Sequence, residues 1–216
     1  MKKIEKLIEL SNNLSKYVVG AEGNVSCKSE NGFYIKASGK SLLNLSKDDL
    51  VLVDGLNRFD KLKPSIETAF HSWIYKNIDV DFIAHTHPVN TLKILCSEEI
   101  YNFSKYRLFP DQVVFNGSES CVVDYFHPGD ELLIEIEKSF NLYVSKNNKI
   151  PKLILLKNHG IITFGKTINE CIFSTEICEK SAEIFLGSLF NPKYLSEFDI
   201  NKIETDEKEK YREKLL

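Results

Sequence analysis

Residues 152–165, KLILLKNHGIITFG, limit the possible folds more than any other part of the chain. This apolar run is interrupted by polar residues only around 158–160, which predicts a strand, a turn and a second strand. Residues 80–87, VDFIAHTH, predict another strand. Residues 24–37 carry two alternating segments, which predict a β-hairpin whose turn is supplied by Asn31 and Gly32.

Helical patterns lie between these strands. Residues 63–77, KPSIETAFHSWIYKN, place apolar side chains at helical spacing, and Pro64 and Ser65 stand at the expected start of the helix. Residues 167–190 predict a long amphipathic helix. Because strands and helices are mixed along the chain, we expect an α/β or α+β fold with a central sheet flanked by helices, in one domain over residues 1–216.

Two shorter segments carry weaker patterns. Residues 50–59, LVLVDGLNRF, predict a second pair of strands with Asp54 and Gly55 at the turn. The charged tail, residues 204–216, predicts a helix.

The composition excludes several classes of protein. Hydrophobic residues make up 43% of the chain and charged residues 27%, as in an ordinary globular protein with a sizeable core. The net charge of −3 and the dispersed lysines argue against an extended nucleic-acid surface. Five cysteines without a C-x-x-C pair predict no disulfide framework and fit a reducing compartment.

The first twenty residues carry two lysines directly after Met1, a basic start like that of a signal peptide. Polar residues such as Glu5, Lys6 and Glu9 interrupt any apolar core, so this segment predicts an amphipathic helix instead. No apolar run approaches the length needed to span a membrane. We therefore expect a cytoplasmic protein with neither a membrane nor a nucleic acid as partner.

Three histidines occupy similar positions at strand ends. His85 and His87 are separated by one residue at the end of the predicted strand 80–87, and side chains two residues apart on a strand share a face. His159, in KNHG, also follows an apolar strand. Three neutral imidazoles with one open position commonly hold a catalytic zinc or similar divalent ion. The sequence therefore predicts a metal site at these three residues.

The other candidate residues have good structural explanations. His71 lies beside the apolar stripe of the predicted helix 63–77, which favours a structural role. His127, in YFHPGD, could line a pocket, although a loop histidine beside proline needs no function. Glu67 would be favoured in a first helical turn by the helix dipole alone, so its claim to function depends on its surroundings.

Two glycine-containing loops could bind an anion. GAEGNVS, residues 20–26, and KASGK, residues 36–40, combine glycine with small hydroxyl or amide side chains. Backbone N–H groups in such loops can bind phosphate. Neither loop is a P-loop, and two tight turns beside a hairpin would give the same pattern.

Taken together, GAEGNVS, KASGKSL, KPSIETAFH, HTHP and KNHG, in this order and at these separations, resemble the class II aldolase/adducin family. The resemblance covers nearly the whole chain. It implies a three-layer α/β/α domain with a central, mostly antiparallel sheet. It also implies a homotetramer with active sites at subunit interfaces.

The resemblance also implies roles for individual residues. His85, His87 and His159 match the zinc ligands, and Glu67 matches the catalytic acid/base. The positions that hold the substrate phosphate in the family match Gly23, Asn24, Ser38, Gly39 and Ser65. Many sugar-phosphate aldolases of the family read P-S-S-E, whereas Ile66 replaces the second serine here and removes one phosphate-binding hydroxyl.

The activity implied is that of a metal-dependent lyase, using zinc or another divalent ion. It would cleave a phosphorylated sugar by a reversible aldol reaction through a metal-stabilised enediolate. Epimerisation, dehydration or decarboxylation of a sugar or sugar-acid phosphate on the same scaffold are the alternatives, and tyrosines and His127 are candidates for a second acid. An adducin-like assembly module without catalysis is less favoured, because a scaffold has no need for three metal-binding histidines and an acid.

Overall fold

The computed structural model describes residues 2–55, 62–188 and 192–214. Its strands are β1 (Asn24–Ser29), β2 (Gly32–Lys36), β3 (Leu50–Val53), β4 (Phe82–Thr86), β5 (Cys121–Val123), β6 (Leu153–Leu156) and β7 (Gly160–Gly165). Its α-helices are α1 (Lys2–Leu14), α2 (Thr68–Asn77), α3 (Val89–Leu95), α4 (Ile100–Lys105), α5 (Pro110–Asn116), α6 (Asp130–Asn147), α7 (Ile168–Gly187), α8 (Glu197–Thr205) and α9 (Glu207–Lys214). Two 3₁₀ helices cover Ser15–Tyr17 and Lys47–Asp49.

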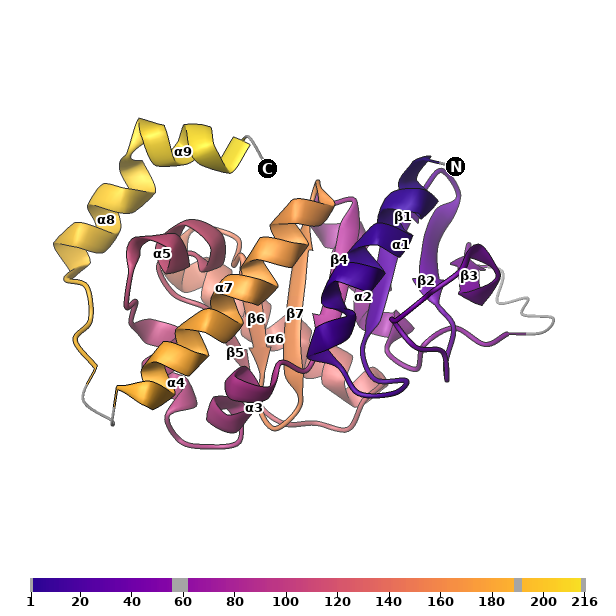
Figure 1. Ribbon diagram of the computed structural model, residues 1–216, viewed down its shortest axis with the longest axis horizontal. Coiled ribbons are helices and arrows are strands. Elements are labelled where there is room, and N and C mark those ends of the chain that lie inside the picture. Colours follow the sequence, from indigo (N-terminus) through magenta and orange to yellow (C-terminus); the bar gives the residue numbers. More distant parts are fainter. Residues whose placement is uncertain (1, 56–61, 189–191, 215–216) are drawn as a thin grey trace.

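The seven strands form one sheet in the order β3-β2-β1-β4-β7-β6-β5. Only β5 and β6 pair in parallel, and the other neighbours are antiparallel. Figure 1 shows α1 and α7 in front of the sheet and α2 and α6 on its far side. The expected three-layer α/β/α fold with a mostly antiparallel sheet is confirmed.

Helices on both faces explain why the strands read as continuous apolar runs. On β6, Ile154 and Leu156 join the hydrophobic cluster beneath α2 and α6, while Leu153 and Leu155 join the cluster on the α7 side. A sheet buried on both faces needs apolar side chains at every position, not at alternate ones. None of the helices in the described part of the chain is long and apolar enough to span a membrane.

The predicted hairpin forms, but its turn lies one residue earlier than expected. Ser29 pairs with Gly32, so the two turn residues are Glu30 and Asn31. Gly32 has a φ of +146°, and a Cβ atom there would lie 1.9 Å from the carbonyl oxygen of Val53. The glycine is therefore required both by the close approach of β3 and by its own positive φ, although it lies on β2 and outside the two-residue turn.

The helix predicted over residues 63–77 begins later than Pro64 and Ser65 indicated. Pro64 forms a β-bridge with Ala37, and α2 starts only at Thr68. Ile66 is 70% exposed and so does not belong to the buried face of a helix. Residues 64–67 form an irregular connection that the predicted helix does not include.

The remaining expectations differ in outcome. The predicted strand-turn-strand over 152–165 is confirmed as β6 and β7, and the long helix predicted over 167–190 is present as α7, with residues 189 and 190 outside the described part of the chain. The first half of the strand pair expected over 50–59 is β3, and its second half lies outside the described residues. The helical tail is present as α9, while α4, α5 and α8 were not predicted.

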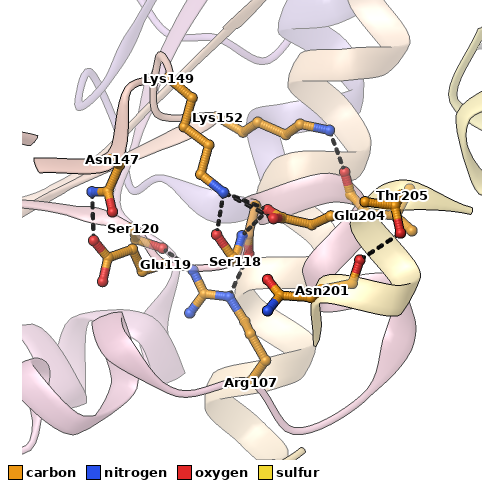
Figure 2. A network of polar contacts seen from close by, with 12 residues as sticks. Arg107, Ser118, Glu119, Ser120, Asn147, Lys149, Lys152, Asn201, Glu204 and Thr205 are labelled. Atoms are coloured by element: carbon orange, nitrogen blue, oxygen red, sulfur yellow. Dashed lines mark hydrogen bonds and ion pairs between the residues drawn. The ribbon is translucent and has the colours of Figure 1, made fainter. Parts of the chain in front are cut away.

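A polar network attaches the C-terminal helices to the body of the protein (Figure 2). Glu204 of α8 accepts hydrogen bonds from the Ser118 backbone N–H at 3.0 Å and from Lys149 Nζ at 2.7 Å. Next to it, the fully buried Arg107 donates from Nε to the Gly117 carbonyl at 2.6 Å and from Nη2 to Ser120 Oγ at 2.9 Å. The backbone carbonyl oxygen of Arg107 accepts a hydrogen bond from the Leu195 N–H at 2.8 Å, so this arginine links residues 117–120 to the segment that precedes α8.

We predict that Arg107→Met lowers the melting temperature by roughly 6–12 °C, equivalent to about 3 kcal/mol, because several buried carbonyl groups would lose their donor. Lys149→Ala is the matched control. The ion pair that it removes is partly exposed, so it should cost at most about 1 kcal/mol. Differential scanning calorimetry measures both variants. Equal losses would contradict the structural importance assigned to Arg107.

Candidate metal and catalytic site

The three histidines predicted to bind a metal come together at one end of the sheet. His85 lies on β4, His87 follows the end of that strand, and His159 lies in the turn between β6 and β7. One ligand nitrogen from each ring lies within 4.8 Å of the other two, and the Nε2 atoms of His85 and His87 are 3.0 Å apart. The arrangement has the donor types and spacing to hold one divalent ion.

Hydrogen bonds leave the ring nitrogens of His85 in the state that metal binding requires. His85 Nδ1 donates to the Ile161 carbonyl at 2.9 Å, which leaves Nε2 without a proton. Burial lowers the pKa of His85 to about 4, so its ring is neutral at physiological pH. Burial also lowers the pKa of His87, whose Nδ1 lies 3.4 Å from a carboxylate oxygen of Glu22. Neutral imidazoles oriented by such partners are typical metal ligands.

His159 and Glu67 supply a further sign that the cluster receives a ligand. His159 Nε2 lies 3.1 Å from Glu67 Oε1, and this Oε1 atom is buried without a hydrogen-bond partner among the described residues. A buried polar atom without a partner is costly, and a bound group commonly satisfies it. The chemistry of the donor set therefore fits the divalent ion expected from the sequence.

Glu67 reaches the same cluster from the residue preceding α2. Its side chain is 6% exposed, and Asn24 Nδ2 donates to Oε2 at 2.8 Å. Oε2 is 3.4 Å from His85 Nε2, and Oε1 is 3.1 Å from His159 Nε2. Burial alone would raise the pKa of this carboxyl, but the adjacent histidine rings, which become positively charged at low pH, outweigh burial and lower it to about 2. Glu67 is therefore a carboxylate able to accept a proton.

Two glycines allow the backbone to pack against the histidines. Gly23 has a φ of +63°, and a Cβ atom there would lie 2.7 Å from the carbonyl oxygen of His85. A Cβ atom on Gly160 would lie 2.5 Å from His87 Cδ2 and 2.6 Å from the Thr86 carbonyl oxygen. Any other residue at either position would displace the candidate ligands.

The residues expected to hold phosphate lie on three segments that contact one another. Ser38 and Gly39 are exposed in the turn after β2, and the Ser38 N–H donates to the Lys63 carbonyl at 2.9 Å, which places this turn beside the segment of Ser65. Asn24 is buried, and its Nδ2 also donates to Ser65 Oγ at 3.2 Å. Their role in binding phosphate stays a prediction.

Lys36 joins two of these segments and was missed in the sequence. It is 2% exposed, and Nζ donates to the carbonyl oxygens of Ala21 at 3.0 Å and Lys40 at 2.5 Å. Burial lowers its pKa to about 8, against the opposing influence of Glu67. Nothing in residues 33–37 distinguishes this lysine from a solvent-exposed one, because its burial depends on the loops that cover it.

The two remaining histidines differ in position. His127 is exposed in the connection between β5 and α6. His71 is fully buried on α2, as the apolar stripe predicted.

Comparisons with known proteins agree with this geometry. A model of the class II aldolase and adducin N-terminal domain matches residues 5–186. An L-fuculose phosphate aldolase of Methanococcus maripaludis is 34% identical over 170 residues, which are 78% of this chain and 87% of that protein. A 3-oxo-tetronate 4-phosphate decarboxylase of Pectobacterium atrosepticum is 29% identical over 192 residues, 87% of this chain and 84% of that protein.

The fold is also shared with solved structures. The crystal structure of YgbL from Escherichia coli, a putative aldolase/epimerase/decarboxylase, superposes with a TM-score of 0.76. The match covers 93% of this chain and 97% of that chain at 21% sequence identity.

We predict that the purified protein holds one divalent ion per chain and that His87→Ala lowers the metal content, because one of three ligands is lost. His127→Ala, which removes an exposed histidine, should leave the content unchanged. Elemental analysis of the three preparations measures this. Equal metal in the wild type and His87→Ala would contradict the assignment of His87.

Proposed function

Because this chain belongs to the class II aldolase and adducin family, we propose that it is a metal-dependent lyase that cleaves a phosphorylated sugar by a reversible aldol reaction. The convergence of three histidine rings and one buried carboxylate carries the proposal. The 34% identity to a protein named L-fuculose phosphate aldolase supports a ketose 1-phosphate as the first substrate to test.

His85, His87 and His159 would hold the ion. The donor set of three imidazoles fits zinc or another divalent metal, which when bound supplies a Lewis acid for the carbonyl and hydroxyl oxygens of the substrate. The protein itself contributes the three rings, their position and a largely buried surrounding. His85 is oriented by its bond to the Ile161 carbonyl.

Glu67 would carry the proton. In the direction of synthesis, its carboxylate removes a proton from the carbon next to the carbonyl group of the ketone phosphate. In the direction of cleavage, it returns a proton to the same carbon. A carboxyl whose pKa is lowered is charged and ready to act as the base, and its position beside the histidines brings it near the reacting atoms.

The glycine-containing loops would bind the phosphate group. Backbone and side-chain donors of Gly23, Asn24, Ser38, Gly39 and Ser65 are the candidates. Lys36 supports this role, because it holds the loop of Ala21 against the loop of Lys40 and adds a positive charge beneath both. Ile66 offers no hydroxyl and is exposed, so the pocket has one donor fewer than a P-S-S-E sequence would give.

A second candidate is another reaction of a sugar-acid phosphate on the same site. The observation that favours it is the 29% identity to a protein named 3-oxo-tetronate 4-phosphate decarboxylase, over 87% of the chain. Decarboxylation, dehydration and epimerisation need the same metal and phosphate positions, and they differ in the bond that breaks. The choice depends on a second acid, for which we propose a residue of a neighbouring subunit in a cytoplasmic homotetramer.

The test is an assay of the metal-loaded protein with L-fuculose 1-phosphate, other ketose 1-phosphates and 3-oxo sugar-acid phosphates. Formation of dihydroxyacetone phosphate identifies aldol cleavage, and release of carbon dioxide identifies decarboxylation. Absence of turnover on the whole panel, with full metal, would contradict the proposed lyase and favour a non-catalytic assembly module.

We predict that Glu67→Gln lowers turnover by about 10²- to 10⁴-fold, because the change keeps the shape of the side chain and removes the proton carrier. Metal content is measured in the same sample, since a lost ion would imitate a lost base. If Glu67 only favours the start of its helix, the variant should lose roughly 0.3–1 kcal/mol of stability and little activity. Near-normal turnover with full metal would exclude Glu67 as the base.

We predict that the protein in solution has four times the 24.8 kDa mass of one chain, since we place the second acid on a neighbouring subunit. Light scattering coupled to gel filtration measures the mass at several concentrations. A monomer that retains full activity would rule out a site shared between subunits.

A further inference from the structure

We propose that His71 is a positioning residue that holds the carboxylate of Glu67 in place through Asn24. These three residues belong to a buried chain of hydrogen bonds that begins at Tyr75 and ends at Glu67. The inference rests on the proposed function in one respect, namely that Glu67 is the proton carrier. The direction of each hydrogen bond can be tested without measuring any activity.

Four consecutive contacts make up this chain of hydrogen bonds. Tyr75 OH is 2.8 Å from Ser26 Oγ, and Ser26 Oγ is 2.7 Å from His71 Nδ1. His71 Nε2 is 2.5 Å from Asn24 Oδ1, and Asn24 Nδ2 is 2.8 Å from Glu67 Oε2. His71, Asn24 and Ser26 are each at most 1% exposed, so water does not compete for these bonds.

The spacing of the residues in the sequence explains the contacts. Glu67, His71 and Tyr75 are spaced four residues apart, so their side chains lie on one face of α2 and of the residue that precedes it. Asn24 and Ser26 are two residues apart on β1 and point to the same face of the sheet. The polar side chains of the helix and the strand thus alternate, each strand residue bridging two helix residues.

The direction of every bond follows from the chemistry of the groups. The Glu67 carboxylate can only accept, so the Nδ2 amide of Asn24 must face it and Oδ1 must face His71. Oδ1 can only accept as well, so His71 must carry its hydrogen on Nε2. A neutral imidazole has no second hydrogen, and its Nδ1 therefore accepts from Ser26, which in turn accepts from Tyr75. Burial, which lowers the pKa of His71 to about 3, supports the neutral form.

His71 thereby selects the orientation of the Asn24 amide. With the opposite orientation, a carbonyl oxygen would face the Glu67 carboxylate and repel it. In the orientation observed, one Nδ2 hydrogen reaches Glu67 and the other reaches Ser65 Oγ. Glu67 has no capping hydrogen bond to its own helix, so the hydrogen bond from the Asn24 amide to Oε2 helps to restrain its position. A fixed general base is needed for proton transfer, because catalytic geometry tolerates little displacement.

The kinetic test compares two substitutions of His71. His71→Gln keeps a donor toward Asn24 and an acceptor toward Ser26, whereas His71→Leu keeps neither. We expect His71→Leu to lower kcat roughly 10- to 100-fold with a much smaller change in KM, and His71→Gln to recover most of kcat. Metal content is measured in each preparation. A wild-type kcat in His71→Leu, or a His71→Gln variant no better than His71→Leu, would overturn the proposal.

Asn116→Ala is the matched control for a loss of stability alone. The Asn116 amide is buried and donates to the carbonyl oxygen and to Oγ of Ser174, each at 2.9 Å, in a contact between α5 and α7. This variant should lower the melting temperature about as much as His71→Leu and leave kcat unchanged. A similar fall of kcat in the control would show that His71 acts only through stability.

The second test needs no substrate and remains decisive if His71→Leu does not fold. A long-range ¹H–¹⁵N correlation spectrum of the full chain, labelled at its histidines, reports which ring nitrogen carries hydrogen. We expect His71, assigned by comparison with His71→Gln, to be neutral with its hydrogen on Nε2. A hydrogen on Nδ1, or on both nitrogens, would overturn the proposed hydrogen-bond directions even if the lyase activity were found. The expected tautomer in a protein without lyase activity would support these directions and contradict only the proposed function.

Discussion

The position of β4 between β1 and β7 determines where the polar groups of the site lie. Antiparallel pairing places Asn24 of β1 opposite His85 on one side, and Ile162 of β7 opposite His85 on the other. His85 then donates to the Ile161 carbonyl, while Asn24 lies within reach of Glu67. A shift of the register by one residue would turn His85 to the other face of the sheet, toward α1 and α7. The backbone pairing of three strands therefore holds the site together.

This arrangement buries many polar groups in a domain stabilised chiefly by apolar packing. Glu67, His71 and His85 are at most 6% exposed, and a polar group taken out of water destabilises the fold unless it is hydrogen-bonded. The bonds along β1 and α2 meet that requirement for His71 and for Oε2 of Glu67, and the Ile161 carbonyl meets it for His85 Nδ1. These bonds also restrict the side chains to one arrangement. The clusters beneath α2 and α6, and beneath α1 and α7, offset the remaining cost.

The sequence could predict those features that depend on local periodicity. Histidines two residues apart on a strand share a face, so His85 and His87 could be paired from spacing alone, and His159 followed from its matching strand end. The start of α2 was misplaced, because Pro64 pairs with β2 and does not begin the helix. The burial of Lys36 could not be read from spacing, since its partners belong to loops that the fold alone brings together.

The chemistry and the specificity of the site rest on different kinds of structure. The candidate ligands and Glu67 are held by strands, by the N-terminal end of α2 and by buried bonds, so their geometry is set by the core. Apart from Asn24 on β1, the candidate phosphate donors lie in turns and irregular connections, and Lys36 joins two of these loops from beneath. Changes in such turns, of which the exposed Ile66 is one example, can alter the substrate without disturbing the core. The same metal and carboxylate could therefore serve aldol cleavage or decarboxylation, with the turns and a neighbouring subunit selecting the bond that breaks.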